Sequence, residues 1–418
     1  MVTQELVRVQ AQRAKNAAID LALLSDTIKN KILLAMADAL VNEQERILAA
    51  NALDMQVGRE KGMRDSFLDR LLLTDVRLEA IADGLRKVAQ LPDPVGKIID
   101  GKTLPNGLTI TKVKVPLGLI GIIYEARPNV TADAVGLCIK SGNAVILKGG
   151  SEAINSNKII SDVLAGAGEY AGMPKGAVQF IDTAERIAVD ALIHLDGIVD
   201  VIIPRGSAGL IKMVVKNSTV PVIETGAGVC HTYIDASAQV DMAVAIAFNA
   251  KVSRPSTCNA METLLVNKNI ADEFMPAMIV KYREAGVILI GDEAAQRYAR
   301  SIKAADENAW AIEYGDLHLN VKIVDSMEEA IAHIRKYSTG HSEAIVTENY
   351  ANARRFQAAI DAAAVYVNAS TRFTDGFEFG FGAEIGISTQ KLHARGPMGL
   401  PELTTFKYLV NGNGQIRE

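Results

Sequence analysis

The N-terminal part of the chain shows the hydrophobic pattern of successive helices. From Glu5 to about Gln90, apolar residues recur at spacings of three and four positions, with polar residues between them. The clearest run is Ile28, Ile32, Leu33, Met36 and Leu40. This spacing lines one face of an α-helix with apolar side chains. Pro92 and Pro94 then end the pattern, so we predict a group of helices before residue 92.

A two-residue alternation follows the helical region. Apolar and polar residues alternate from Lys97 to Val115, with Pro105-Asn106-Gly107 between the two halves. Alternation on both sides of a Pro-Asn-Gly turn predicts a β-hairpin, and we expect it to project from the body. Thr404 to Val410 also has the pattern of a strand. It has little to pack against locally, so we expect it to pair with the hairpin or with a neighbouring subunit.

Short apolar runs alternate with helical stretches over most of the remaining chain. The first series of predicted strands comprises residues 119–124, 144–147, 178–181, 199–203 and 221–223. A second series begins near Thr232 and includes residues 262–266, 287–290, 321–324, 344–346 and 364–367. Such alternation is typical of parallel sheets with right-handed crossovers. We therefore predict an α/β fold with two Rossmann-like parallel-sheet domains and a small β ribbon.

Composition and charge narrow the classes of function. A chain of 418 residues accommodates two or three folded units. With 44 basic and 49 acidic residues and no long basic run, nucleic acid is not expected as a partner. The most apolar stretch, Val115 to Tyr124, is far shorter than the about 20 residues that span a bilayer. Polar residues interrupt the N-terminus, which argues against a secretory signal, so we expect a cytoplasmic protein.

The cysteines and histidines point to a nucleophile rather than to a metal or a disulfide. Three cysteines without a CxxC pair argue against a disulfide framework, and the six histidines lack metal-ligand spacing. Cys138 lies among apolar residues and is predicted to be buried. Cys230 is also predicted to be structural, although it follows the glycine turn at 226–228. Cys258 stands in a polar turn, and from the residues alone it is either a nucleophile or a structural thiol.

Glycine spacing alone does not identify a cofactor site. Gly166-Ala-Gly168-Glu-Tyr-Ala-Gly172 has one residue too many for the dinucleotide fingerprint and ends a predicted helix. Gly226-Ala-Gly228 lacks the third glycine. The ordinary fingerprint is therefore absent.

Five segments resemble the gamma-glutamyl phosphate reductase family, a branch of the aldehyde dehydrogenase superfamily. They are Ile123-Tyr-Glu-Ala-Arg-Pro-Asn-Val-Thr131, Ser141-Gly-Asn-Ala-Val-Ile-Leu-Lys-Gly-Gly-Ser-Glu152, Val222-Ile-Glu-Thr-Gly-Ala-Gly228, Arg254-Pro-Ser-Thr-Cys-Asn259 and His393-Ala-Arg-Gly-Pro397. The resemblance covers essentially the whole chain. It implies an oxidoreductase of proline biosynthesis, a phosphorylating glutamate-5-semialdehyde dehydrogenase that reduces L-glutamyl 5-phosphate with NADPH.

The resemblance also implies how the chain is divided. Residues 1–96 and 123–226 would form the cofactor-binding domain, and residues 227–396 the catalytic domain. Residues 97–122 and 397–418 would form an oligomerisation hairpin and tail. The expected fold is thus aldehyde dehydrogenase-like, with a homo-oligomer held together through the ribbon.

The implied catalytic residues are Cys258 and its neighbour Asn259. Cys258 matches the essential cysteine of the superfamily, and its thiolate would displace phosphate to give a thioester that hydride then reduces. Backbone N–H groups at Cys258 would stabilise the oxyanion. Glu224 matches the superfamily glutamate that activates water, but a reductase has no use for that water. We therefore expect Glu224 to be turned away or to orient groups near the cofactor.

Further matches predict the cofactor site. Lys148 matches a lysine that contacts the adenosine ribose, and Gly206 and Ser207 match a helix start that faces the pyrophosphate. Ser151 replaces a glutamate of NAD-preferring relatives, which removes repulsion against a 2′-phosphate and favours NADPH. Glu313 falls where relatives bind the nicotinamide ribose. No metal is expected.

Arginines are the candidates for the two anionic groups of the substrate. Arg127, Arg254 and Arg372 are predicted to meet the phosphate and the α-carboxylate, and the assignment of each stays open. The side chain of the oxyanion hole has no clean match, because Glu125 falls at that position and Asn129 lies nearby.

Two rival functions stay open at this point. A hydrolytic NAD-dependent aldehyde dehydrogenase would use Glu224 as a general base. A catalytically silent scaffold would serve as a binding or structural protein. Glutamate 5-kinase is expected as a transient partner of a reductase, because it would supply an unstable substrate.

Overall fold

The computed structural model describes residues 2–125 and 127–417, which form two compact units. The first unit contains the chain up to Thr225, Gly380–Gly386 and the residues from Met398 on. The second unit contains Gly226–Phe379 and Ile387–Pro397. No helix in these described parts is both long and apolar enough to span a bilayer.

The predicted N-terminal helices are present in the first unit. They are α1 (Val2–Leu21), α2 (Asp26–Asn42), α3 (Gln44–Glu60), α4 (Asp65–Leu71) and α5 (Asp75–Gln90). The side chains of Ser25 and Thr74 cap α2 and α5 by accepting backbone N–H bonds in the first turn. The apolar face of α2 is buried at Ile32, Leu33 and Met36, as its spacing predicts.

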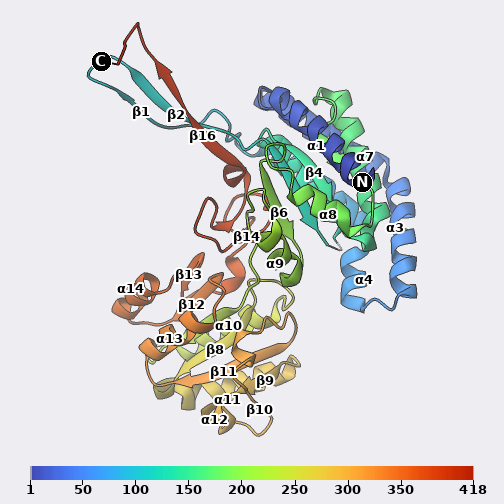
Figure 1. Cartoon of the computed structure of the whole chain (residues 1–418). Helices are drawn as coiled ribbons and strands as arrows, with labels where there is room; N and C mark the ends of the chain where they lie inside the picture. Colours follow the sequence, from blue (N-terminus) through green and yellow to red (C-terminus); the bar gives the residue numbers. More distant parts are fainter. Residues whose placement is uncertain (1, 126, 418) are drawn as a thin grey trace. The chain divides into compact units, whose positions relative to one another are not determined.

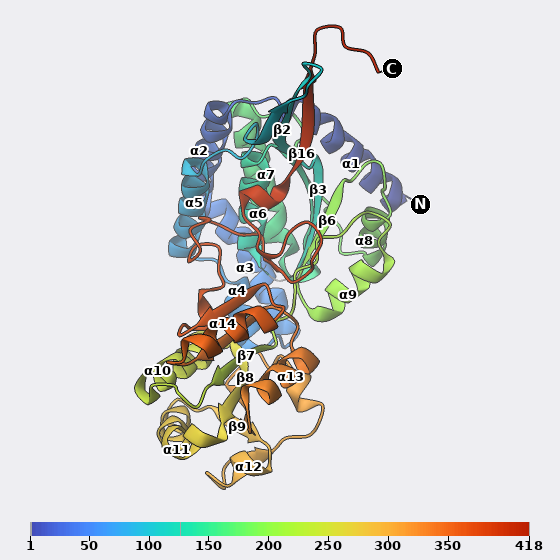
Figure 2. The ribbon, with the colours of Figure 1, turned by 90° about the vertical axis from the view of Figure 1, so that its left-hand side faces the viewer.

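The predicted hairpin and C-terminal strand form one antiparallel ribbon. Its strands are β1 (Ile98–Thr103), β2 (Thr109–Pro116) and β16 (Thr404–Asn411), in the order β1-β2-β16. Gly107 supplies the left-handed conformation of the turn, with φ at +88°. The ribbon extends away from the helices of its own unit (Figures 1 and 2). Of the two pairings considered for residues 404–410, the structure shows the one with the hairpin.

A four-stranded parallel sheet forms the centre of the first unit. Its order is β5-β4-β3-β6, with β3 (Leu119–Tyr124), β4 (Ala144–Lys148), β5 (Val178–Phe180) and β6 (Val201–Arg205). The helices of this region are α6 (Pro128–Lys140), α7 (Ile154–Ala171), α8 (Arg186–Ile193) and α9 (Ala208–Asn217). Helices α6 and α7 cover one face, whereas α1 and α8 lie together on the other (Figure 2).

Two details of this sheet differ from the predicted boundaries. The expected strand at 221–223 makes only an isolated bridge between Ile202 and Val222, so that prediction was wrong. Pro221 lacks the N–H that a longer ladder needs. The parallel sheet begins at Leu119, so residues 119–122 belong to it and not to the ribbon.

The second unit is built on a seven-stranded parallel sheet. Its order is β10-β9-β11-β8-β7-β12-β13. The strands are β7 (Cys230–Ile234), β8 (Met261–Asn267), β9 (Ile288–Gly291), β10 (Lys303–Ala304), β11 (His318–Val324), β12 (Ser342–Val346) and β13 (Ala364–Val367). The helices are α10 (Val240–Val252), α11 (Lys268–Glu284), α12 (Glu293–Gln296), α13 (Met327–Tyr337) and α14 (Tyr350–Ala359). The short pair β14 (Ile387–Ser388) and β15 (Gly396–Pro397) lies outside this sheet.

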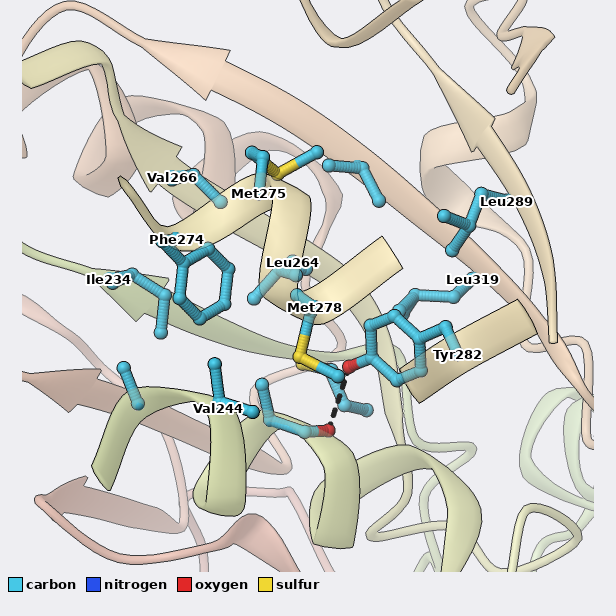
Figure 3. Close-up of a cluster of buried hydrophobic side chains, with 14 of the residues drawn as sticks. Ile234, Val244, Leu264, Val266, Phe274, Met275, Met278, Tyr282, Leu289 and Leu319 are labelled. Carbon is cyan, nitrogen blue, oxygen red and sulfur yellow. Dashed lines mark hydrogen bonds between the residues drawn. The ribbon is translucent and has the colours of Figure 1, made fainter. Parts of the chain in front are cut away.

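Separate apolar clusters cover the two faces of this sheet. The first packs α10 and α11 against the sheet around Phe274 and Met278 (Figure 3). Within it, the buried Tyr282 hydroxyl donates to the Ala247 carbonyl at 2.8 Å. The second cluster holds α13 and α14 through residues such as Ile331 and Phe356. With both faces covered, β7, β8 and β12 are buried along their whole length, as expected for a parallel sheet, although they include polar residues such as His231, Glu262 and Glu343.

Candidate active site

Cys258 lies in a short loop that joins the end of α10 to the amino end of β8. The loop begins as a turn, because the Thr257 hydroxyl donates to the Arg254 carbonyl at 2.9 Å. The Ala260 N–H then donates to the Thr257 carbonyl at 3.0 Å. Cys258 is partly exposed, whereas Cys138 and Cys230 are buried. Of the three cysteines, Cys258 therefore has the access that a nucleophile needs, and we name residues 253–260 the nucleophile loop.

Two residues from the strand β7 segment support the main chain of Cys258. A Cβ atom at residue 228 would overlap the Cys258 carbonyl group, so only glycine allows this close approach. The Cys230 thiol donates to the same carbonyl oxygen at 3.2 Å. Burial raises the pKa of Cys230 well above its usual value, which keeps the proton on sulfur for this bond. Cys230 is buried, as expected of a structural thiol, and it contacts the main chain of Cys258.

Asn259 and Arg372 hold the nucleophile loop from the other side. Arg372, in the turn η3 (Thr371–Phe373), donates to Ser253 Oγ at 3.1 Å, to Thr257 Oγ1 at 2.8 Å and to Asn259 Oδ1. The Asn259 amide donates in turn to the carbonyls of Arg372 and Thr374 at 3.2 and 2.9 Å. Its oxygen also accepts the Thr257 hydroxyl. The Asn259 side chain therefore uses its whole hydrogen-bonding capacity within the protein.

The loop carries positive charge. Burial lowers the pKa of Arg372, and the positive charge of Arg254 lowers it further, while the Cys258 thiol opposes the shift. Arg254 is exposed to solvent. Two guanidinium groups that influence each other beside a cysteine form a local positive field, which favours a thiolate and an anionic ligand.

Glu313 belongs to the same unit as Cys258 but lies in a separate loop before β11. Its side chain is exposed. Two residues further, the Gly315 N–H donates to Glu262 of β8 at 3.3 Å. The Tyr314 hydroxyl donates to Asn320 of β11 at 2.9 Å. These bonds fix the loop on the sheet and leave the Glu313 carboxylate at the surface.

In the first unit, the candidate cofactor residues gather at the carboxyl ends of the strands. The chain proceeds from β3 to β4 and β5, and then returns to place β6 on the other side of β3. A crevice for a ligand is expected at such a topological switch point. Glu125 follows β3 there, and Gly206 and Ser207 follow β6.

A carboxylate of the protein occupies the helix start at this switch point. Ser207 is the N-cap of α9, and its backbone N–H donates to Glu125 Oε2 at 2.6 Å. Its hydroxyl donates to Glu125 Oε1 at 3.1 Å. The start of α9 thus holds an anionic group with its main chain, as the charge at a helix N-terminus favours. A cofactor phosphate has the same requirements, so these residues fit the predicted pyrophosphate site.

Lys148 and Ser151 lie beyond the carboxyl end of β4. The Lys148 ammonium group donates to the Gly149 carbonyl at 2.7 Å, and burial lowers its pKa while Glu152 opposes that shift. Ser151 is exposed at the start of η1 (Ser151–Ala153), with its hydroxyl 3.5 Å from the Glu152 carboxylate. Sequence reasoning overlooked Glu152, which adds negative charge beside the residue expected to meet the 2′-phosphate.

The other predicted site residues also belong to the first unit. Arg127 is the N-cap of α6, and Asn129 in its first turn donates to Asp133 at 3.0 Å. Desolvation raises the pKa of Asp133 to about 6. Glu224 is half-buried and precedes Thr225, whose hydroxyl donates to the Pro204 carbonyl at the end of β6 at 2.7 Å. Arg127, Asn129 and Glu224 thus lie on segments next to the switch point, and their predicted roles remain predictions.

Sequence reasoning named Cys230 and Glu125 but did not predict their contacts with Cys258 and Ser207, and it missed the buried Lys251–Glu262 pair. The contacts of Cys230 and Glu125 join segments that are far apart in the sequence, so no local pattern indicates them. Among residues 2–125 and 127–417, no group of three or more His, Cys, Asp or Glu residues is arranged to hold a metal ion.

The chain is similar to known proteins over nearly its whole length. The aldehyde dehydrogenase family model matches residues 1–297. A gamma-glutamyl phosphate reductase of Moorella thermoacetica is 59% identical, with 99% of each chain covered. A protein of the same name from Caldanaerobacter subterraneus is 55% identical, with 99% of this chain and 100% of the other covered.

Solved structures show the same similarity. The crystal structure of gamma-glutamyl phosphate reductase from Thermotoga maritima matches with a TM-score of 0.96 and 47% identity, over 99% of this chain and 100% of that one. An acetylating aldehyde dehydrogenase from Geobacillus thermoglucosidasius, 19% identical, matches with a TM-score of 0.72 over 100% of this chain and 98% of that one. The latter match shows a shared fold.

Proposed function

Because the chain belongs to the aldehyde dehydrogenase family and, within it, to the gamma-glutamyl phosphate reductases, we propose how it carries out that reduction. The substrate is L-glutamyl 5-phosphate, the products are L-glutamate 5-semialdehyde and phosphate, and the reaction passes through a thioester on Cys258. The observation that carries this proposal is the partly exposed Cys258, on a loop held by Cys230, Asn259 and Arg372.

The covalent step uses groups that this chain provides. The Cys258 thiolate attacks the carbonyl carbon of the acyl phosphate, so that a carbon–sulfur bond forms and the carbon–oxygen bond to phosphate breaks. Phosphate leaves as a stable anion and needs no acid. Arg254 and Arg372 place positive charge beside this thiol, and a nearby positive charge favours the ionised form of a thiol. In the following step, reduction of the thioester gives an oxyanion, which backbone N–H groups at Cys258 and Asn259 stabilise. Collapse of this oxyanion releases the aldehyde and restores the thiolate.

NADPH, when bound, supplies the hydride that reduces the thioester. Ser207 and Gly206 offer the pyrophosphate the helix start that Glu125 occupies in this structure, and Lys148 and Ser151 are assigned to the 2′-phosphate. Glu313 is assigned to the nicotinamide ribose, and Glu224 to orienting groups near the cofactor. Preference for NADPH over NADH rests on the serine at 151 and the lysine at 148.

The substrate anions require cationic partners. Arg254 is the best candidate for one of them, because it is exposed and lies on the nucleophile loop itself. Arg372 contributes charge, although it also donates to three residues of the loop. Arg127 and Asn129 are the candidates in the first unit.

The decisive assay runs the reaction backwards, because glutamyl phosphate is unstable. The protein is incubated with NADP, phosphate and glutamate 5-semialdehyde, and NADPH formation is followed by absorbance. We expect formation that depends on phosphate and disappears in Cys258→Ala. Formation of NADPH without phosphate would indicate a hydrolytic aldehyde dehydrogenase, and a complete lack of turnover would indicate a silent scaffold.

A second assay tests the fate of the thioester. Without NADPH, freshly generated glutamyl phosphate should release about one phosphate per active chain in a burst, followed by slow release. Glu224→Gln should lower reductive turnover far less than Cys258→Ala does, because the thioester must be protected from water. Continuous phosphate release without NADPH that is lost in Glu224→Gln would make the protein a hydrolase.

The ribbon supports the proposal of a homo-oligomer, and the cytoplasm is the proposed location of this biosynthetic enzyme. Strand β16 lies at the edge of its sheet, and Phe406, Tyr408 and Val410 expose large apolar surfaces along it. An exposed apolar edge is ready to pair with another chain. Sedimentation of Val410→Lys tests this, with a smaller species as the expected result. Glutamate 5-kinase is proposed as a transient partner on chemical grounds, since its product is labile.

A further inference from the structure

Strand β8 carries an irregularity directly after the nucleophile loop. On the neighbouring strand β7, Cys230 is opposite Met261, whereas the next residue, His231, is opposite Thr263. Glu262 is therefore the extra residue of a β-bulge. Bulges redirect side chains and often lie next to functional sites. Here the bulge turns a carboxylate into the interior, where Glu262 has no exposed surface.

The redirected carboxylate pairs with a lysine at the other end of the same loop. Lys251 Nζ lies 2.7 Å from Glu262 Oε2, and both side chains are fully buried. Lys251 stands in the last turn of α10, just before the nucleophile loop, and Glu262 stands just after it. The ion pair thus joins the two ends of the segment that carries Cys258.

The other carboxylate oxygen reaches a third segment. Glu262 Oε1 accepts the backbone N–H of Gly315 at 3.3 Å. Gly315 follows Glu313 by two residues, in the loop before β11. The buried Glu262 side chain therefore contacts both Lys251, next to the nucleophile loop, and the segment that carries Glu313, a proposed cofactor contact.

A buried ion pair is weak evidence for a role in stability. Two buried charges lose their hydration, and well-packed apolar residues of similar volume are often equally stable or more stable in their place. Met261, Leu264, Leu265 and Val266 of the same strand are apolar and buried, and besides Glu262 only Thr263 and Asn267 are polar, so an apolar pair would suit much of the surroundings. An ion pair differs from an apolar contact in having a preferred geometry.

We propose that Lys251 and Glu262 are positioning residues, which hold the base of the nucleophile loop and couple it to the Glu313–Gly315 segment. The catalytic meaning of this inference rests on the proposed function of Cys258. Both side chains are fully buried, so they act through the loop and do not contact substrate.

Two double variants separate the contribution of the ion pair from that of the hydrogen bond to Gly315. Lys251→Met with Glu262→Met removes both charges and the acceptor for the Gly315 N–H. Lys251→Met with Glu262→Gln removes both charges but keeps that acceptor. Neither leaves an unpaired buried charge. Hydrogen–deuterium exchange, read by mass spectrometry on the full chain without cofactor, reports the order of each segment directly.

We expect faster exchange of residues 253–260 in both double variants, and of residues 313–316 only in the variant with Glu262→Met. The turnover number should fall about 100-fold in both, as expected when a nucleophile is misplaced by about 1 Å. The KM for the cofactor should rise only in the Glu262→Met variant. Lys140→Met is the matched control, because Lys140 is also fully buried in an ion pair, with Asp26 at 2.5 Å. It should leave exchange of 253–260 unchanged.

Folded double variants with the exchange and the turnover number of the parent protein would overturn the inference. Equally fast exchange of residues 253–260 in Lys140→Met would show that the effect comes from a general loss of stability. That result would also overturn the inference. Should the double variants fail to fold, Glu262→Asp keeps the charge and shortens the side chain, and it should loosen the same two segments. If Cys258→Ala retained turnover, the proposed function would fail, but the exchange data would still decide whether this pair orders the loop.

Discussion

The two α/β units of this chain place their candidate residues at opposite edges of their parallel sheets. In the first unit, Glu125, Lys148 and Gly206 stand at or beyond the carboxyl ends of β3, β4 and β6. In the second unit, Gly228 and Cys258 stand before the amino ends of β7 and β8. Ligands of open parallel sheets usually bind beyond the carboxyl ends of the strands. The candidate residues of the first unit follow this rule, and those of the second unit do not.

The electrostatics of the two edges differ accordingly. Helices begin at a carboxyl edge, so backbone N–H groups with no acceptor inside the helix can hold an anion there, as that of Ser207 holds the Glu125 carboxylate. Helices end at an amino edge, and the end of α10 presents partial negative charge to the loop that follows it. A thiolate at Cys258 needs compensation from side chains, which Arg254 and Arg372 provide. Negative charge is thus compensated by backbone N–H groups at the carboxyl edge of the first unit and by side chains at the amino edge of the second unit.

Removal of the Cys258 thiol should have the largest effect, and it should lower turnover with little change in cofactor binding. We expect Cys258→Ala to lower turnover by at least about 1000-fold, because no other group can form the thioester. The dissociation constant of NADP, measured by calorimetry, should change little, since most of the proposed cofactor residues lie at the carboxyl edge of the first unit. Substantial residual turnover would contradict the assignment of the nucleophile.

Removal of a side-chain support of the amino edge should come next. Arg372→Met eliminates the bonds to Ser253, Thr257 and Asn259 and one of the two charges. We expect the turnover number to fall about 100-fold, with proper folding confirmed by thermal melting. Arg335→Met is a matched control, since Arg335 donates to the Ala359 carbonyl at the surface of the same unit. Similar losses in both variants would show that Arg372 has no special role.

Charge at the carboxyl edge should change cofactor preference by a smaller factor. Ser151→Glu would place a second carboxylate beside Glu152 and repel the 2′-phosphate of NADPH. We expect the ratio of kcat/KM for NADPH to that for NADH to fall about tenfold. Ser151→Gln has a similar shape without the charge and should preserve the ratio. Equal use of both cofactors by the parent protein would refute the predicted preference.

The smallest effect is expected at the start of α9, where the Glu125 carboxylate is held by Ser207. Glu125→Gln removes the carboxylate that the start of α9 holds, so the cofactor no longer competes with it for Ser207. The dissociation constant of NADP should decrease about threefold. Ser207→Ala is the companion variant and should weaken binding. A loss of affinity in Glu125→Gln would mean that Glu125 shapes this edge and does not compete with the cofactor.

Most elements of the fold follow from local sequence patterns. The helices before Pro92, the hairpin at 98–116 and the strands β3, β4, β12 and β13 lie where the spacing of apolar residues predicts them. Such patterns work because the repeat of a helix or strand decides which side chains share a face. The pattern fails at residues 221–223, where an apolar run makes only one bridge, because pairing depends on a partner that the run itself does not specify.

The sequence by itself also indicated Cys258 as the accessible thiol, because it stands in a polar turn and in the Arg254–Asn259 segment of the family resemblance. Only the tertiary structure decided what supports that thiol. Arg372 reaches Asn259 across 113 residues of chain, Cys230 reaches the Cys258 carbonyl across 28, and a one-residue bulge directs Glu262 toward Lys251. These contacts depend on strand order and register, which arise when the whole sheet assembles, and no short stretch of sequence contains them.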